Sequence, residues 1–209
     1  MIKEKKTPGL AASSTRGTGP GGLRPREFAQ WYRDHEIEMW QELDLDAIDK
    51  IARVLEAAEK KGSQVFVIGN GGSAATASHI ATDWAKTAER SGKPLLRSMS
   101  LTDNVPFMTA IANDLGYDEV FVRQLKNYLR RGDIVVIISG SGNSPNVVKA
   151  AKFARSVGAL TVGMTGFSGG KLRKLVDICL HVESEQYGVI EDLHMAVGSI
   201  LAFYLKQRR

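Results

Sequence analysis

Residues 65–73 read VFVIGNGGS and run from Val65 to Ser73. Four apolar residues followed at once by glycines are typical of a strand that is buried on both faces and that turns directly into a helix. The pattern returns at 134–144, where IVVII precedes SGSGNS. Because ligands of parallel sheets bind outside the carboxyl ends of the strands, both glycine-rich loops are expected at that edge.

Both loops are suited to a phosphate group. Glycine lacks a Cβ atom and permits positive φ, so the backbone of 69–73 passes close to a ligand. The helix that follows directs its free N–H groups and the positive end of its dipole to the same place. The second loop adds three hydroxyls and an asparagine that shapes the turn: Ser139, Ser141, Asn143 and Ser144. It contains no lysine, which favours a sugar phosphate over a nucleoside triphosphate; two ordinary strand–helix turns are the simpler alternative.

Two nucleotide-binding motifs compete with this interpretation. The segment GNGGSA at 69–74 fits the dinucleotide pattern G-x-G-x-x-A after a strand. The acid that binds the ribose is expected about 20 residues further on, whereas Asp103, the nearest candidate at a strand end, lies too far along the chain. A P-loop is excluded, because Gly170-Lys171 is followed by Leu172 and not by Ser or Thr.

From residue 65 onward, short apolar stretches alternate with helical patterns. This alternation predicts an α/β fold, a doubly wound, Rossmann-like parallel sheet sandwiched between helices. The expected strands cover 65–68, 95–101, 134–138, 160–164 and 177–183. The expected helices cover 73–86, 105–113, 117–130, 144–157 and 190–206, with a further short helix after the glycine-rich turn 166–170.

Residues 1–25 are rich in Gly, Ser, Thr and Pro and predict a flexible leader. Residues 26–209 are then a single domain that begins with a helical hairpin. The first helix starts near Pro25, a favoured first-turn residue, and Asp44 caps the second. Rings recur at helical spacing in the first helix and indicate packing in a core or between subunits: Phe28, Trp31, Tyr32 and His35.

The composition is that of a soluble globular protein, with 43% hydrophobic and 24% charged residues in 209. The net charge is +5, and part of the excess of lysine and arginine lies near the two ends of the chain. This distribution indicates solvated tails and argues against nucleic-acid binding. The single cysteine, Cys179, cannot form an internal disulfide, consistent with a reducing, cytoplasmic location. No apolar run approaches the roughly 18–20 residues that cross a bilayer, and no secretory signal is recognised, so no membrane association is expected.

Four segments together resemble the SIS (sugar isomerase) domain family, and within it the phosphoheptose isomerases. They are GNGGSAATASH (69–79), NDLGYDEVF (113–121), ISGSGNSPNVVKA (138–150) and TGFSGGKL (165–172). The resemblance implies a homotetramer with active sites between subunits. It also implies the interconversion of sedoheptulose 7-phosphate, a seven-carbon ketose phosphate, with an aldose phosphate. Family members can carry zinc, so the expected cofactor is a divalent metal, zinc.

The resemblance assigns binding roles residue by residue. An acid that contacts sugar hydroxyls corresponds to Asp114. The first substrate loop corresponds to Asn70, Gly71, Gly72 and Ser73, and the phosphate loop to Ser139, Ser141, Asn143 and Ser144. Gly140 stands where the isomerases commonly have threonine, so one phosphate hydroxyl is missing.

The same comparison assigns metal and catalytic groups. His79 matches a metal ligand, Asp83 stands in place of a glutamate that is both base and ligand, and Glu191 stands in place of a glutamine ligand. Residues four apart share a helix face, so His79 and Asp83 are placed to bind one metal ion. The family's second catalytic group, a histidine, is replaced by Ser199, with His194 as a nearby substitute. The expected catalytic residues are Asp83, Glu191 and His194, and the expected metal ligands are His79, Asp83 and Glu191.

Isomerisation through an enediol needs one group that moves a proton between adjacent carbons, and a second group or a metal that stabilises the oxyanion. The sequence therefore predicts an aldose–ketose isomerase that acts on sedoheptulose 7-phosphate and feeds heptose and glycoconjugate synthesis. Two alternatives stay open. The first is a non-catalytic SIS protein that binds a sugar phosphate or a replication initiator, which the serine at 199 favours. The second is an isomerase of another phosphosugar.

Overall fold

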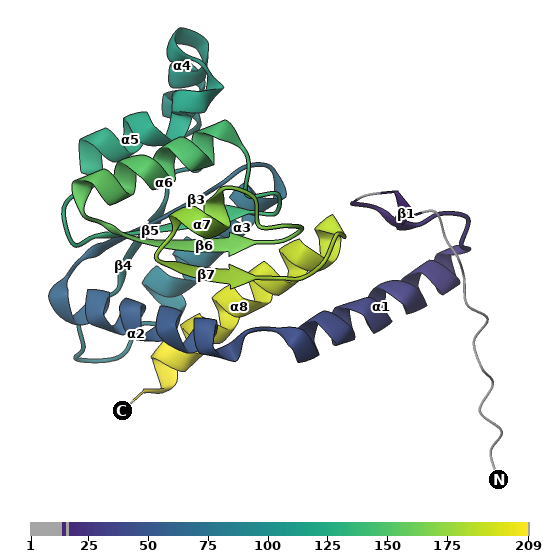
Figure 1. The fold of residues 1–209 in the computed structure, drawn as a ribbon. Coiled ribbons are helices and arrows are strands. Elements are labelled where there is room, and N and C mark those ends of the chain that lie inside the picture. The colour runs from purple at the N-terminus through teal and green to yellow at the C-terminus, as the bar shows by residue number, and fades with distance from the viewer. Residues whose placement is uncertain (1–13, 16, 209) are drawn as a thin grey trace.

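The structure, a computed structural model, describes residues 14, 15 and 17–208. Its centre is a five-stranded parallel sheet with the order β4-β3-β5-β6-β7 (Figure 1). The strands are β3 (Gln64–Gly69), β4 (Arg97–Ser100), β5 (Ile134–Ser139), β6 (Leu160–Thr165) and β7 (Ile178–His181). Because β4 lies on one side of β3 and the later strands on the other, the strand order reverses between β3 and β5. This arrangement confirms the predicted doubly wound α/β fold.

Helices cover both faces of the sheet (Figure 1). One face carries α2 (Leu45–Lys61), α3 (Gly72–Thr82) and α8 (Tyr187–Gln207), and the other carries α5 (Val120–Tyr128), α6 (Pro145–Val157) and α7 (Leu172–Leu175). Two helices extend beyond these layers. They are α4 (Val105–Leu115), which projects above α5, and α1 (Pro25–Glu42), which packs on part of α8 and then leaves the sheet.

The strands form the core because successive residues point to opposite faces. In β5, Ile134, Val136 and Ile138 belong to the cluster with α2 and α8, whereas Val135 and Ile137 belong to the cluster with α5 and α6. All five side chains are at most 3% exposed. Burial on both faces explains the continuous apolar runs in the sequence, and it stabilises the fold at roughly 25 cal/mol per Å² of apolar surface.

The N-terminal hairpin of helices begins and turns as the sequence predicts. Pro25 is the first residue of α1, and the Asp44 side chain accepts a hydrogen bond from the backbone N–H of Ala47 at 3.0 Å, which caps α2. The α1–α2 hairpin brings α2 against the sheet, while α1 carries its aromatic rings toward the start of α8.

Part of the predicted leader packs on the domain. Residues 1–13 and 16 lie outside the described residues. The remainder includes the short antiparallel strands β1 (Ser14–Thr15) and β2 (Gly19–Pro20). Between them, Gly17 is buried and forms a bridge to Gln186, the residue before α8. This contact places the N-terminal segment beside the carboxyl ends of the strands (Figure 1).

Some helix boundaries differ from the sequence expectation for local reasons. The helix expected over 73–86 is α3 followed by a π-helix, η1 (Asp83–Thr87). The wider turn accompanies burial of Trp84, whose indole N–H donates to the carbonyl of Gly198 on α8 at 3.0 Å. The last helix begins at Tyr187 rather than 190, because the Gln186 side chain caps it by accepting from the N–H of Val189 at 2.9 Å.

By length and composition, α8 is long and apolar enough to cross a bilayer, which the sequence analysis did not anticipate. However, half of its apolar window is buried inside the protein. Its residues Val197, Leu201 and Leu205 are each at most 1% exposed. The core helix of a globular domain meets the same criterion, and α8 packs as the core helix of its face of the sheet.

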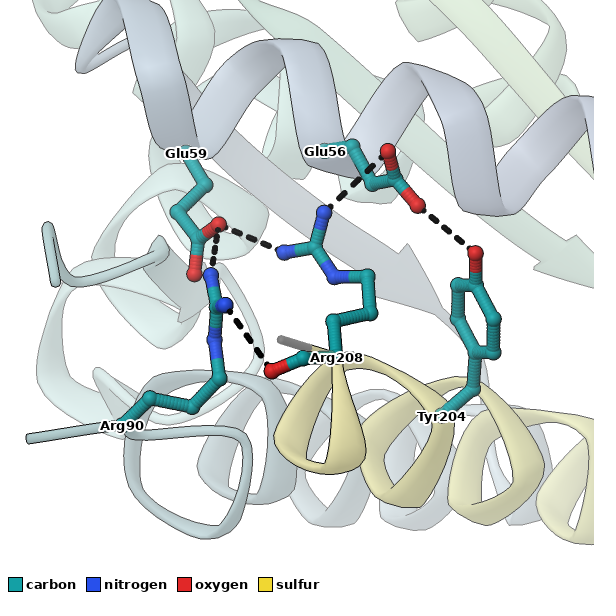
Figure 2. A network of polar contacts seen from close by, with 5 residues as sticks. All are labelled: Glu56, Glu59, Arg90, Tyr204 and Arg208. Carbon is teal, nitrogen blue, oxygen red and sulfur yellow. Dashed lines mark hydrogen bonds and ion pairs between the residues drawn. The ribbon is translucent and has the colours of Figure 1, made fainter.

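A polar network fastens the end of α8 to α2 (Figure 2). Arg90 and Arg208 share the carboxylate of Glu59, at 2.7 and 2.5 Å. Arg208 also lies 3.1 Å from Glu56, which accepts a hydrogen bond from the Tyr204 hydroxyl at 2.8 Å. The Glu59 side chain is only 5% exposed, so its charge depends on these two guanidinium groups.

Candidate functional site

The two glycine-rich loops meet where the strand order reverses, at the carboxyl ends of β3 and β5. Ligands of doubly wound sheets bind in this crevice, and a cavity of about 160 Å³ lies there. Both loops and the start of α8 line it, through Asn70, Ser73, Ile138, Ser139, Gly140, Ser141, Ser144, Tyr187 and Glu191. The structure thus brings together most of the predicted substrate residues and one predicted catalytic residue.

The first loop depends on its glycines. A Cβ atom at Gly69 would lie 2.5 Å from the carbonyl oxygen of Ser73. Gly71 precedes α3 with a φ of 55°, and a Cβ atom at Gly72 would collide with the carboxylate of Glu191. Neither glycine lines the cavity, but the missing side chain at Gly72 lets Glu191 lie against the N-terminus of α3.

A reciprocal pair of amides joins the two loops. The Nδ2 group of Asn70 donates to Oδ1 of Asn146, and Nδ2 of Asn146 donates to Oδ1 of Asn70, both at 2.9 Å. The Tyr117 hydroxyl also donates to Oδ1 of Asn70, at 3.0 Å, which fills both lone pairs of that oxygen. One N–H of Asn70 is left for a ligand oxygen. Asn146 is 1% exposed and was missed by the sequence analysis; its place in the first turn after the serine loop was the available signal.

The serine loop combines hydroxyls with a helix N-terminus. Ser139 Oγ accepts from the N–H of Gly142 at 3.2 Å, and Ser141 Oγ accepts from the N–H of Asn143 at 3.3 Å. Ser144 precedes α6 but makes no side-chain capping bond. Each hydroxyl therefore keeps its hydrogen for a ligand. Together with the positive end of the α6 dipole, the loop is suited to an anion.

Asn143 holds this loop and does not line the cavity. Its Nδ2 donates to the carbonyl of Ser141 at 3.1 Å, and its Oδ1 accepts from the N–H of Lys171 at 3.2 Å. A further bond joins the N–H of Gly166 to the carbonyl of Gly140, at 2.8 Å. The loop that contains Gly166 and Lys171 therefore fixes the shape of the serine loop.

Two aromatic residues that the sequence analysis missed close one side of the cavity. Tyr187 lines the cavity, and Phe167 packs on it with ring centroids 4.7 Å apart and planes at 64°. Among the described residues, Phe167 is the one non-glycine residue with positive φ, at 49°. Such backbone geometry is costly for a bulky residue and concentrates at functional sites. No local sequence pattern indicates this pair.

Glu191 is the carboxylic acid that lines the cavity. Burial, and then the nearby charge of Asp192, raise the pKa of its carboxyl group. Asp192 in turn accepts a hydrogen bond from the Tyr32 hydroxyl at 2.5 Å, and burial together with this acid raises the pKa of Tyr32. A carboxyl whose pKa is raised exchanges protons more readily near neutral pH.

The expected metal ligands do not come together within one chain. The Nε2 atom of His79 lies 3.2 Å from Oδ2 of Asp83, but Glu191 lies against Gly72, roughly 10 Å or more away along α3. Across residues 14, 15 and 17–208, no three His, Cys, Asp or Glu side chains form a group that could hold a metal. Zinc sites use three or four protein ligands, so this pair does not fit one.

The predicted catalytic residue His194 lies in the core and not at the cavity. Its side chain is fully buried, and its Nε2 donates to the carbonyl of Thr165 at 3.3 Å. Burial lowers the pKa of His194 to about 4, so the imidazole is neutral near pH 7. The third predicted catalytic residue, Asp83, also does not line the cavity; it accepts from the Thr87 hydroxyl at 3.0 Å within the π-helix.

Asp114 lies outside the cavity as well. It is exposed near the end of α4, where it accepts from Nδ2 of Asn113 at 2.8 Å. It lines a separate cavity of about 500 Å³ formed by α4 and α5, together with Arg123 and Lys126. From the same segment, 113–121, it is Tyr117 that reaches the first loop.

Comparisons with known proteins agree with this fold. Residues 32–166 match the family model of the SIS domain. The phosphoheptose isomerase of Rhodospirillum rubrum is 42% identical over 155 residues, which are 74% of this chain and 82% of that protein. This chain belongs to the phosphoheptose isomerase family. The structure of the phosphoheptose isomerase from Neisseria gonorrhoeae superimposes with a TM-score of 0.82, at 28% identity, over 88% of this chain and 100% of that one.

A second family member, the probable phosphoheptose isomerase of Thermoplasma acidophilum, is 41% identical over 166 residues, 79% of this chain and 91% of that protein. A Cβ atom at Gly140 would lie 3.4 Å from the ring of Tyr187, which is an ordinary van der Waals contact, so the structure does not require glycine there. Nothing in the structure explains Ser199.

Proposed function

We propose that this chain is an aldose–ketose isomerase that converts sedoheptulose 7-phosphate into an aldoheptose 7-phosphate for heptose and glycoconjugate synthesis. Membership in the phosphoheptose isomerase family supports the reaction class. The observation that carries the proposal is the single cavity lined by the serine loop, Asn70 and Glu191, because it combines an anion site with an acid–base group.

In this proposal, the serine loop binds the phosphate group. The hydroxyls of Ser139, Ser141 and Ser144 donate to phosphate oxygens, and the dipole of α6 favours the negative charge. The cavity of 160 Å³ is smaller than the roughly 300–1,000 Å³ of typical small-molecule sites, too small to enclose a whole seven-carbon sugar phosphate. The sugar chain must therefore extend out of the cavity, and in this proposal it passes Glu191.

Glu191 moves the proton. Its carboxylate removes a proton from C1 of the ketose, and the electrons of that C–H bond form the C1–C2 double bond while the C2 oxygen takes up negative charge. The free N–H of Asn70 stabilises this oxyanion. Return of the proton to C2, with transfer of the O1 proton to O2, gives the aldose. These steps use protein groups alone, because the described residues of one chain do not assemble the expected zinc site.

The proposal includes a cytoplasmic homotetramer. Exposed apolar side chains support assembly: Val105, Tyr117 and Phe203 are 60%, 53% and 62% exposed, and contacts between copies would remove them from water. Light scattering coupled to size-exclusion chromatography is expected to give the mass of four chains. A monomer at micromolar concentration would contradict the tetramer.

Product analysis by NMR tests the function. We expect the purified chain to form an aldoheptose phosphate from sedoheptulose 7-phosphate, and unphosphorylated sedoheptulose to react far more slowly. The variant Ser139→Ala with Ser144→Ala should raise KM by roughly tenfold or more for each hydroxyl, since hydrogen bonds to charged groups contribute about 1.5–3 kcal/mol. Ser156→Ala, an exposed serine on α6, is the matched control. Absence of product at any enzyme concentration would refute the isomerase.

A second candidate is a protein that binds the sugar phosphate without turnover. It is favoured by Ser199, which stands where the family has its second catalytic histidine. Binding of sedoheptulose 7-phosphate with neither product nor proton exchange would select this candidate. Turnover of a different phosphosugar would instead keep the mechanism and change the substrate.

A further inference from the structure

The ring of Tyr187 lies beside two glycines that are far apart in the sequence. On one side, a Cβ atom at Gly140 would lie 3.4 Å from Cε1 and 3.5 Å from Cδ1 of the Tyr187 ring. On the other side, a Cβ atom at Gly17 would lie 2.8 Å from Cδ2 and 3.0 Å from Cε2. A side chain at position 17 would therefore collide with one edge of the ring, whereas a side chain at position 140 would only touch the other edge.

The backbone of the N-terminal segment and the ring of Phe167 also contact Tyr187. The N–H of Tyr187 donates to the carbonyl of Gly17 at 3.3 Å, and Gly17 bridges to Gln186. Phe167 packs edge-on against Tyr187, with centroids 4.7 Å apart. Tyr187 is nevertheless 49% exposed and lines the cavity. A ring that is fixed from behind and open in front is suited to contact a ligand.

The position of Tyr187 gives it a selective role. It lies four residues before Glu191, so both side chains lie on one face of α8. A sugar chain that ran from the serine loop toward Glu191 would pass the ring, since all three line the same cavity. We propose that Tyr187 is a specificity-determining residue that selects phosphate esters of a primary carbon. A CH₂ group is thin enough to pass the ring, whereas a phosphate attached directly to a sugar-ring carbon brings that sugar ring against Tyr187. The inference rests on the proposed phosphate site but not on turnover.

A binding experiment with the full chain tests this selectivity. Dissociation constants are measured by calorimetry for glycerol 3-phosphate, an ester of a primary carbon, and for glucose 1-phosphate, whose phosphate is on a ring carbon. The wild-type chain is expected to bind the first about tenfold or more tightly than the second, and Tyr187→Ala to lose most of that preference. Tyr187→Phe should keep the preference, because the ring and not the hydroxyl is responsible. Tyr128→Ala, which removes an exposed tyrosine at the end of α5, should behave as wild type.

The outcomes separate this inference from the function. An unchanged preference in Tyr187→Ala, or equal binding of both esters by the wild type, overturns the inference and leaves the isomerase intact. A retained preference in Tyr187→Phe with a lost one in Tyr187→Ala supports it even if the chain turns over no sugar. Binding of neither ester refutes the phosphate site itself. Circular dichroism establishes that each variant is folded, and Tyr187→Leu replaces the alanine variant if that one is not.

Discussion

The pKa of Glu191 sets the first prediction for a single residue. Burial and Asp192 raise it above the ordinary value of 4.5, and the base form is required to remove a proton. The value of kcat/KM should therefore fall as the pH drops through a value above 4.5. Asp192→Asn removes the negative neighbour and should move this acid limb to lower pH. A pH profile measured from about pH 4 to 9 checks the shift, and an unmoved limb would contradict the assigned role of Glu191.

A second residue-scale prediction concerns acid stability. Burial lowers the pKa of His194 from 6.5 to about 4, so the folded state resists its protonation. The neutral, buried imidazole contributes to the free energy of unfolding above pH 6.5. This contribution is lost as the pH falls toward 4, and the loss is at most about 3 kcal/mol. His194→Gln should weaken this pH dependence, which urea unfolding at pH 7.5 and at pH 4.5 measures. His79→Gln, whose side chain is 53% exposed in the native protein, is the control. Equal loss in wild type and His194→Gln would contradict the assignment.

The segment around β1 and β2 carries the element-scale prediction. Gly17→Ala introduces a methyl group 2.8 Å from the Tyr187 ring, at a φ of 92°. The displaced ring should raise KM by roughly tenfold while kcat changes little, because the change affects binding and not proton transfer. Gly22→Ala is a sharp control, since Gly22 also has positive φ, 79°, but no atom lies near its Cβ position. Equal effects of the two substitutions would show that backbone strain, and not ring contact, is responsible.

The same elements show what a sequence can and cannot predict here. Strand β5 and the loop that follows it are local patterns, so their type and place were predicted correctly. The meeting of the two loops follows from the parallel topology. The contact between Gly17 and Tyr187, by contrast, joins residues 170 positions apart and leaves no periodic signal. Helix spacing predicted that Asp83 takes part in the site together with His79. The two residues do share a helix face, but the cavity lies at the other end of α3, so Asp83 does not reach it.

At the scale of the whole molecule, Glu59 joins α2 to the C-terminal end of α8 (Figure 2). Glu59→Gln removes the charge shared by Arg90 and Arg208, whose side chains are 13% and 14% exposed. Breaking a buried ion pair costs about 3–5 kcal/mol, so the free energy of unfolding should fall by roughly 3 kcal/mol while kcat is unchanged. Urea unfolding measures the loss. Asp49→Asn, from the exposed pair with Arg53, should cost at most about 0.5 kcal/mol, and a similar small loss for Glu59→Gln would contradict the role of the network.

The central claim is that the cavity between β3 and β5 moves a proton between adjacent carbons of a ketose phosphate, with Glu191 as the carrier. NMR of sedoheptulose 7-phosphate in D₂O tests it directly, by following aldose formation and deuterium entry at C1 and C2. The account predicts product and deuterium entry with the wild-type chain, and rates lower by roughly 10²–10⁴-fold in Glu191→Gln. Equal rates in the two proteins, or neither product nor exchange with the wild type at saturating substrate, would contradict it.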